Sequence, residues 1–260
     1  MLRTRISALI PLIRLSDKYD MKTVYDEALV RLKRYYTMDL QQWRNNPRRA
    51  TFVSATMEDA IPIINLAYAI NEPDLLTLSC LICTAFDEKI LWEATRQPSG
   101  LQLDDLARIL SGKAALARKC NELDVAFMHW TMTEWRCSVS KPYKHDTCKH
   151  SMTKFMGKPF FGAFVRALAE ESKTLAPQAE GATAKTIWPW SSQNPDVCDN
   201  DRQKLKIKVD KICTELWDAL PAIFDVPKES NGTSDDRNGE SGSSSGDENE
   251  SDSSESSDED

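Results

Sequence analysis

The stretch AIPIINLAYAINEPDLLTLSCLICTAF, residues 60–86, decides the fold. Apolar residues recur at three- and four-residue steps on both sides of Asn71-Glu72-Pro73, and this spacing predicts helix. A short link with a proline at a helix start predicts a helical hairpin. Thr56 is the expected N-cap, with Asp59 three residues later, and Pro62 should kink the first helix or delay its start. The expected buried residues are Ala60, Ile63, Ile64, Ala67, Ile70, Leu75, Leu76, Ser79, Ile82, Cys83 and Phe86.

Two shorter helices are predicted upstream of this hairpin. The first is expected to bury Ile6, Leu9, Ile10, Ile13 and Tyr19. The second is expected to bury Val24, Ala28, Leu32 and Tyr35. Residues 37–53 then form a polar, arginine-rich linker that contains Pro47, and we expect Trp43 to anchor it.

Further helices are predicted downstream. A helix through Leu103, Leu106 and Leu110 is expected to lead, past Gly112, into one that buries Leu116, Cys120, Leu123, Phe127 and Trp130. Residues 160–168 indicate another helix. A final helix, ending at Pro221, carries Leu205, Val209, Ile212, Leu216 and Leu220. No stretch shows strand alternation, so we predict an all-α fold in which helical hairpins pack into one bundle-like body.

The charge of the chain is divided between a body and a tail. The formal net charge is −7, but residues 228–260 hold 12 acidic and 2 basic residues, which leaves 31 basic and 28 acidic residues in 1–227. The tail has 11 serines and no Leu, Ile, Val, Phe, Tyr or Trp. It cannot bury a core, so residues 227–260 are predicted to be disordered. Hydroxyls three residues before an acid predict phosphorylation by acidophilic kinases at Thr233, Ser244, Ser245, Ser256 and Ser257.

Several classes of protein are not expected. The apolar run at residues 6–13 contains Pro11 and is followed by Arg14 and Asp17, which indicates a helix rather than a signal peptide. No stretch approaches the roughly 18 apolar residues of a membrane span. Seven cysteines without framework spacing indicate reduced thiols and a cytoplasmic or nuclear protein. Because no catalytic motif is present, we do not expect an enzyme.

Three parts of the sequence resemble a known family. Residues 10–20, IPLIRLSDKYD, followed by Ala28-Leu29, resemble the closing helices of a BTB/POZ domain. Residues 54–86, with Asn65-Leu66-Ala67 and the Asn71-Glu72-Pro73 turn, resemble the helical region that follows BTB in proteins of filamentous fungi. WDALPAIF, residues 217–224, resembles the ending of those proteins. The likeness spans most of residues 6–226.

The resemblance implies a division of the chain into four parts. Residues 1–36 correspond to the closing helices of a truncated BTB-like domain, 37–53 to a linker, 54–226 to the helical region after BTB, and 227–260 to the tail. The sheet and first helices of the BTB fold have no counterpart here, so dimerisation and ubiquitin-ligase recruitment through them are not implied. The apolar face of residues 6–13 would lack part of its usual partner, which predicts a weak N-terminal hairpin or self-association.

A polar segment contains the candidates for a metal site. Cys137, His145, Cys148 and His150 lie within fourteen residues, and such donors can hold zinc tetrahedrally. The resemblance adds Cys198, with Asp201 where the family has a second cysteine. The candidate ligands are therefore Cys137, Cys148, Cys198, His145 and Asp201. Free thiols in a solvated loop are the simpler interpretation. We therefore expect no cofactor, and a bound zinc ion is the alternative.

The remaining cysteine and histidine patterns favour structural roles. Cys80 and Cys83 have redox spacing but lie inside an apolar helix, where a buried thiol is inert. His129 lies on a helix beside Trp130, and no neighbouring carboxylate or serine forms a nucleophile arrangement with it.

Residues 136–158 form a basic segment. Six basic residues against Asp146 give a formal charge of about +5, and Tyr143 and Phe155 lie between them. Such a segment can bind phosphate backbones, although a solvated face, or an intramolecular complement to the acidic tail, is the simpler interpretation. The six residues are Arg136, Lys141, Lys144, Lys149, Lys154 and Lys158.

Together these patterns predict a non-catalytic protein–protein interaction module, an adaptor or scaffold, whose tail tunes binding electrostatically. The alternative is a zinc-supported nuclear factor that contacts nucleic acid through residues 136–158. The sequence does not name the protein partner, and self-association is one form the interaction can take.

Overall fold

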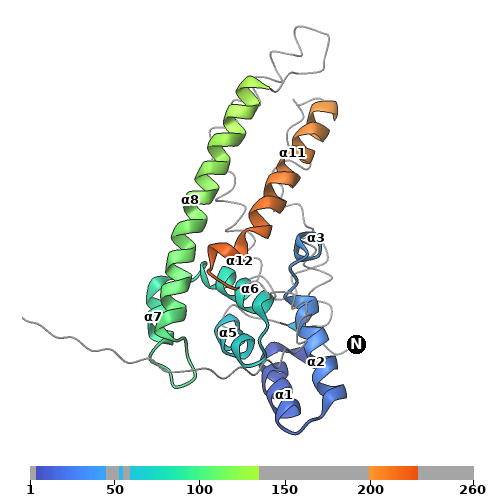
Figure 1. The fold of residues 1–260 in the computed structure, drawn as a ribbon, viewed down its shortest axis with the longest axis vertical. Helices are drawn as coiled ribbons and strands as arrows, with labels where there is room; N and C mark the ends of the chain where they lie inside the picture. The colour runs from blue at the N-terminus through green and yellow to red at the C-terminus, as the bar shows by residue number, and fades with distance from the viewer. Residues whose placement is uncertain (1–3, 45–52, 55–58, 135–198, 228–260) are drawn as a thin grey trace, which may run out of the picture. The chain divides into compact units, whose positions relative to one another are not determined.

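The computed structural model describes residues 4–44, 53–54, 59–134 and 199–227. The predicted all-α fold is confirmed, because nearly all regular structure in these ranges is helical. Figure 1 shows the arrangement of the helices. Residues 1–228 form one compact unit, and residues 229–260 lie outside the described part of the chain.

The hairpin predicted from residues 60–86 lies at the centre of the core. Helix α5 spans Ala60–Ala69 and α6 spans Pro73–Cys83. Asn71 turns the chain with φ 53°, and Pro73 stands in the first turn of α6, as predicted. Residues 75–83 are all buried, and a helix that is buried on every side is the centre of a core. Pro62 lies in the first turn of α5, which begins at Ala60, so the predicted late start is confirmed. The N-cap is Asp59, so the prediction of Thr56 as the N-cap is wrong.

The N-terminal hairpin consists of α1 (Ile6–Lys18) and α2 (Lys22–Tyr35). The predicted buried residues of α1 are confirmed except for Tyr19, which is exposed because the helix ends at Lys18 and Asp20 turns the chain at φ 53°. Ser16 is buried in its place and donates a hydrogen bond to the carbonyl of Leu12 at 2.7 Å. Val24 is also exposed, because it lies in the first turn of α2 beside this bend.

The expectation that the face of residues 6–13 lacks a partner is wrong. Ile6 and Ile13 are fully buried, and α1 packs on both α2 and α5. Next to this contact, Thr4–Arg5 (β1) and Val53–Ser54 (β2) form a parallel two-stranded pair, with Thr4 opposite Val53. A pair of two-residue strands is too short to show alternation in the sequence, so it was not predicted.

The linker predicted at 37–53 contains a short helix, α3 (Leu40–Arg44). Asp39 caps it by accepting hydrogen bonds from the backbone N–H groups of Gln41 at 2.8 Å and Gln42 at 3.0 Å. These bonds favour the charged carboxylate and lower the pKa of Asp39. Trp43 is fully buried, so its predicted role as an anchor is confirmed.

The C-terminal half contains α7 (Glu88–Ala94), α8 (Leu103–Thr133), α11 (Asp199–Asp218) and α12 (Leu220–Ile223). Figure 1 shows α11 running alongside the upper part of α8, and Lys208 lies 5.4 Å from the ring centre of Trp130. The predicted residues of the final helix are buried, but that helix ends at Asp218, before Pro221. Of the predicted residues, Leu205, Val209, Ile212 and Leu216 are buried on α11, and Leu220 is buried in α12.

Helix α8 is continuous, so the predicted passage at Gly112 from one helix to another is wrong. Leu103 and Leu110 are exposed, contrary to expectation. The buried face follows Leu106, Ile109, Gly112, Leu116, Cys120 and Phe127. Gly112 is needed because the ring of the fully buried Phe224 lies where a Cβ atom would be.

Replacing Gly112 by alanine should therefore destabilise the protein. Overpacking against Phe224 costs about 1–3 kcal/mol, and the better helix propensity of alanine offsets up to about 1 kcal/mol of this. We expect the free energy of unfolding in urea to fall by about 1–2 kcal/mol. The control is Ser111→Ala, at the neighbouring exposed position, and a Gly112→Ala variant as stable as the wild type would contradict this packing.

Candidate interaction surface

Most of the predicted site residues lie outside the described part of the chain. This holds for Cys137, His145, Cys148 and Cys198, for the basic segment 136–158 and for the five phosphorylation candidates. Asp201 lies in α11. Within the described ranges, no group of three or more His, Cys, Asp or Glu side chains could hold a metal ion. The zinc site stays a prediction, and a metal content well below one equivalent in the purified protein would contradict it.

The four cysteines within the described ranges are free, buried thiols: Cys80, Cys83, Cys120 and Cys213. Burial raises the pKa of Cys80, Cys120 and Cys213 to about 12, and raises that of Cys83 well above its ordinary value. A neutral, enclosed thiol is a poor nucleophile. The prediction that Cys80 and Cys83 are buried core residues is confirmed.

A polar cluster joins α5 to the first turns of α8. Tyr68 donates a hydrogen bond to Asp105 at 2.6 Å, and Arg108 donates to the Tyr68 hydroxyl and lies 3.5 Å from Asp105. Burial and the bond to Asp105 raise the pKa of Tyr68 to about 12. Asp105 is itself buried, and a buried carboxylate needs such partners. The cluster therefore fixes the base of α8 on the core.

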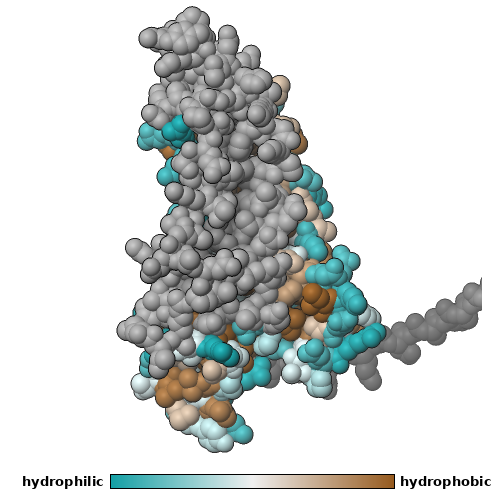
Figure 2. Space-filling view, turned by 180° about the vertical axis from the view of Figure 1, so that it is seen from behind, coloured by the Kyte–Doolittle hydropathy of each residue, from teal (hydrophilic) through white to brown (hydrophobic). Residues whose placement is uncertain are grey.

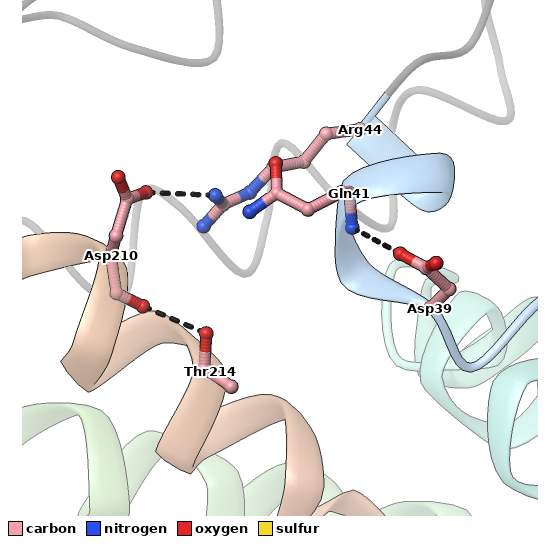
Figure 3. A network of polar contacts seen from close by, with 5 residues as sticks. All are labelled: Asp39, Gln41, Arg44, Asp210 and Thr214. Carbon is pink, nitrogen blue, oxygen red and sulfur yellow. Dashed lines mark hydrogen bonds and ion pairs between the residues drawn. The ribbon is translucent and has the colours of Figure 1, made fainter.

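A second polar contact ties α3 to α11, as Figure 3 shows. The guanidinium of Arg44, which is buried, lies 3.0 Å from the carboxylate of Asp210. Four residues along α11, Thr214 donates to the Asp210 carbonyl at 2.9 Å. The pair joins segments that are 166 residues apart. Like the Tyr68 cluster, it lies between packed helices, so both serve to hold helices together.

The α1–α2 hairpin exposes apolar side chains next to its bend. Figure 2 shows hydrophobic residues at the end of the molecule where this hairpin lies. We call this set the hairpin face; its members, all more than a third exposed, are Leu12, Leu15, Tyr19, Met21 and Val24. Monomeric proteins rarely gather exposed apolar side chains in one place unless the area binds something.

The local sequence explains how the hairpin face arises. Leu12, Leu15 and Tyr19 are separated by three and four residues, so they lie on one side of the helix, away from the buried Ile13. The bend then brings Met21 next to them, and its N–H donates to the carbonyl of Ser16 at 2.8 Å. Our sequence reasoning missed this face, although the second apolar row at 12, 15 and 19 was its signal.

Charges of both signs surround the hairpin face. Arg14, Lys18 and Lys22 lie beside Asp17 and Asp20, and all five side chains are exposed. The ammonium of Lys18 is 5.5 Å from the centre of the Tyr19 ring. An apolar centre with a polar, charged rim is the usual composition of a protein–protein interface. The surface carries no net charge strong enough to indicate a nucleic acid.

Comparison of the chain with protein-family models, curated proteins and solved structures finds no match. None of the described helices is long and apolar enough to cross a membrane.

Proposed function

We propose that this chain is a non-catalytic protein–protein interaction module, an adaptor or scaffold, which binds a protein partner through the hairpin face. The observation that carries the proposal is the exposure of five apolar side chains on a hairpin whose opposite side is fully packed. Tyr19 is 63% exposed and Leu15 49%, whereas Ile6 and Ile13 are completely covered. The hairpin is thus held in place while its outer side is open to a partner.

The energetics of the hairpin face favour binding. Burying a leucine, methionine or aromatic side chain stabilises by about 1.5–3 kcal/mol, and Leu12, Leu15 and Val24 are carried by helices that are already formed. Association costs several kcal/mol of translational and rotational freedom. Backbone hydrogen bonds around the bend hold the main chain of Tyr19 and Met21 in place before any partner arrives, so binding has only their side chains left to order.

The resemblance to BTB proteins supports this proposal. In that comparison, α1 and α2 stand for the closing helices of a BTB-like domain. The hairpin face is then the side of those helices that does not contact the following helical region. A partner with an apolar, helix- or strand-lined surface fits it, and the acidic tail tunes the binding through its net charge of −10, which is screened by salt.

Affinity capture with matched variants tests the proposal. The full-length chain, the double variant Leu15→Asp/Tyr19→Asp and the control Val30→Asp/Ile207→Asp are used as baits in extracts of the source cells. Val30, on α2 but not part of the hairpin face, and Ile207, on α11, are exposed aliphatic residues. We expect the wild type and the control to capture the same protein, and the double variant to lose at least 90% of it, as expected when central contacts are removed.

Two results would count against the proposal. One is that no protein binds the wild type above background. The other is that the double variant captures as much as the control does. Circular dichroism melts of all three baits ensure that loss of capture does not reflect loss of folding, because substitutions at exposed positions change stability by only about 0.5 kcal/mol.

A further inference from the structure

Helix α8 carries a second row of residues along its whole length, and all of them are alanine or larger apolar residues except Asn121. The row occupies nine positions, and the side chains at all nine are exposed. Its members are Leu103, Ala107, Leu110, Ala114, Ala117, Asn121, Val125, Met128 and Met132. We call it the α8 row.

The α8 row is straight. From Leu103 to Met132 the chain advances 29 residues in eight steps of three or four, or about 3.6 residues a step, which is the period of an α-helix. The row therefore runs parallel to the helix axis for about 43 Å. It lies on a different side of α8 from the buried row through Ile109, Leu116 and Phe127. The buried row packs against the core, whereas the α8 row is exposed.

Size varies along the α8 row in a regular way. The large side chains stand at its ends, Leu103 and Leu110 at one and Val125, Met128 and Met132 at the other. The middle holds alanines and Asn121, which permit close approach of another helix. A groove of about 880 Å³ runs beside the second half. Its lining residues are Arg118, Asn121, Glu122, Val125, Ala126 and His129.

We infer that the α8 row binds the α8 row of a second copy of this chain, antiparallel, around a two-fold axis close to Ala117. Apart from Ala117 itself, the positions of the row are symmetric about the midpoint between residues 117 and 118. An antiparallel copy places Leu103 opposite Met132, and Leu110 opposite Val125. It also places the small Ala107 opposite the large Met128. A two-fold interface requires such self-complementarity.

The charges beside the row fit the same register. Along one edge of the row, Arg118 lies near the two-fold axis. The residue opposite it is residue 117 of the second copy, and Glu122 of that copy is only about five residues further along the helix. Along the other edge, Lys113 lies close to Asp124 of the second copy. Each contact occurs twice by symmetry. A parallel arrangement would instead place Arg118 against Arg118 and Lys113 against Lys113 in register, with the large ends stacked on each other.

This inference concerns a different surface from the hairpin face and does not depend on it. Sedimentation velocity of the full-length chain, at about 1–100 µM, is the first test. A monomer has a mass of 29.4 kDa, and we expect a concentration-dependent dimer of twice that mass. Leu110→Glu should raise the dimer dissociation constant by about a hundredfold or more, because symmetry introduces the buried charge twice. Val30→Glu, at an exposed site on α2, should leave it unchanged.

Cysteine cross-linking tests the antiparallel register. Ala117→Cys should form an intermolecular disulfide under mild oxidation, since the two copies of residue 117 face each other across the axis. Leu103→Cys alone should not, because its two copies would be about 43 Å apart, but mixed with Met132→Cys it should give a cross-linked pair. The wild type, oxidised in the same way, controls for its seven native cysteines.

Three outcomes would overturn the inference. They are a wild-type chain that stays monomeric up to 100 µM, a dimer that Leu110→Glu does not weaken, and self-cross-linking of Leu103→Cys. A monomer would mean that another segment of the chain or a different protein covers the row. Dimerisation and the capture experiment use separate variants, so either proposal can fail without the other.

Discussion

Replacing Trp217 by alanine is expected to lower the free energy of unfolding by about 3–5 kcal/mol. Trp217 is almost completely buried, and its ring centre lies 5.4 Å from that of Trp43. Its indole N–H also donates a hydrogen bond to the carbonyl of Met38 at 2.6 Å. The substitution leaves a cavity and an unpaired carbonyl between α11 and the segment before α3. Both effects weaken the contact between α11 and the segment that contains Met38 and Trp43.

Urea unfolding followed by circular dichroism measures the loss. The control is Trp92→Ala, since Trp92 is 48% exposed on α7 and is contacted from outside by Arg96. That change should cost no more than about 0.5 kcal/mol. Equal stabilities for the two variants would show that the Trp43–Trp217 contact does not hold α3 on α11.

The protein is expected to lose stability steeply as the pH rises from about 9 to 12. A thiol is neutral when protonated, and burial raises the pKa of Cys80, Cys120 and Cys213 to about 12. In the unfolded chain the same thiols lose their protons near their ordinary value of 9. As the pH rises above 9, the unfolded chain releases thiol protons while the folded protein keeps them, which favours unfolding. The stability present below pH 9 is therefore lost as the pH rises to the pKa of the thiols in the folded protein. Each such group contributes a slope of about 1.4 kcal/mol per pH unit.

Urea midpoints between pH 8 and 10.5 test this dependence. The double variant Cys80→Ala/Cys83→Ala should show a shallower decline, by up to about 1.4 kcal/mol per pH unit for each thiol removed. Ser79→Ala, in the same buried helix, has no titrating group and should follow the wild-type slope. Identical slopes for all three proteins would mean that these thiols are not enclosed as the structure places them.

The sequence predicts the helices of this fold well because their signals are local. The period of residues 60–86, the turn at Asn71 and the proline at the start of α6 lie within one short stretch. The errors concern which side of a helix is buried. In α1 and α8, two rows of apolar residues compete, and periodicity does not tell which one meets the core. Tyr19, Leu103 and Leu110 were assigned to the wrong row for this reason.

Contacts between distant segments could not be predicted. The pairing of Thr4 with Val53, the approach of Gly112 to Phe224 and the pair of Arg44 with Asp210 each join separate elements. No local pattern marks them, because each depends on how the helices dock. The hairpin face could not be predicted for the same reason, because the exposed side of α1 depends on how α1 packs against α5. By contrast, the burial of Cys80 and Cys83 could be predicted from their apolar helix alone.

Hydroxyl-radical footprinting of the captured complex tests the central claim most directly. Met21 and Tyr19 are reactive and exposed in the free chain, and methionine oxidation reports solvent access at a single side chain. We predict that the partner lowers labelling of Met21, Tyr19 and Leu15 several-fold, while the exposed Trp92 on α7 is labelled as before. Unchanged labelling of Met21 and Tyr19 in a complex that is otherwise protected would show that the protein binds through another surface and that the hairpin face is not its docking site.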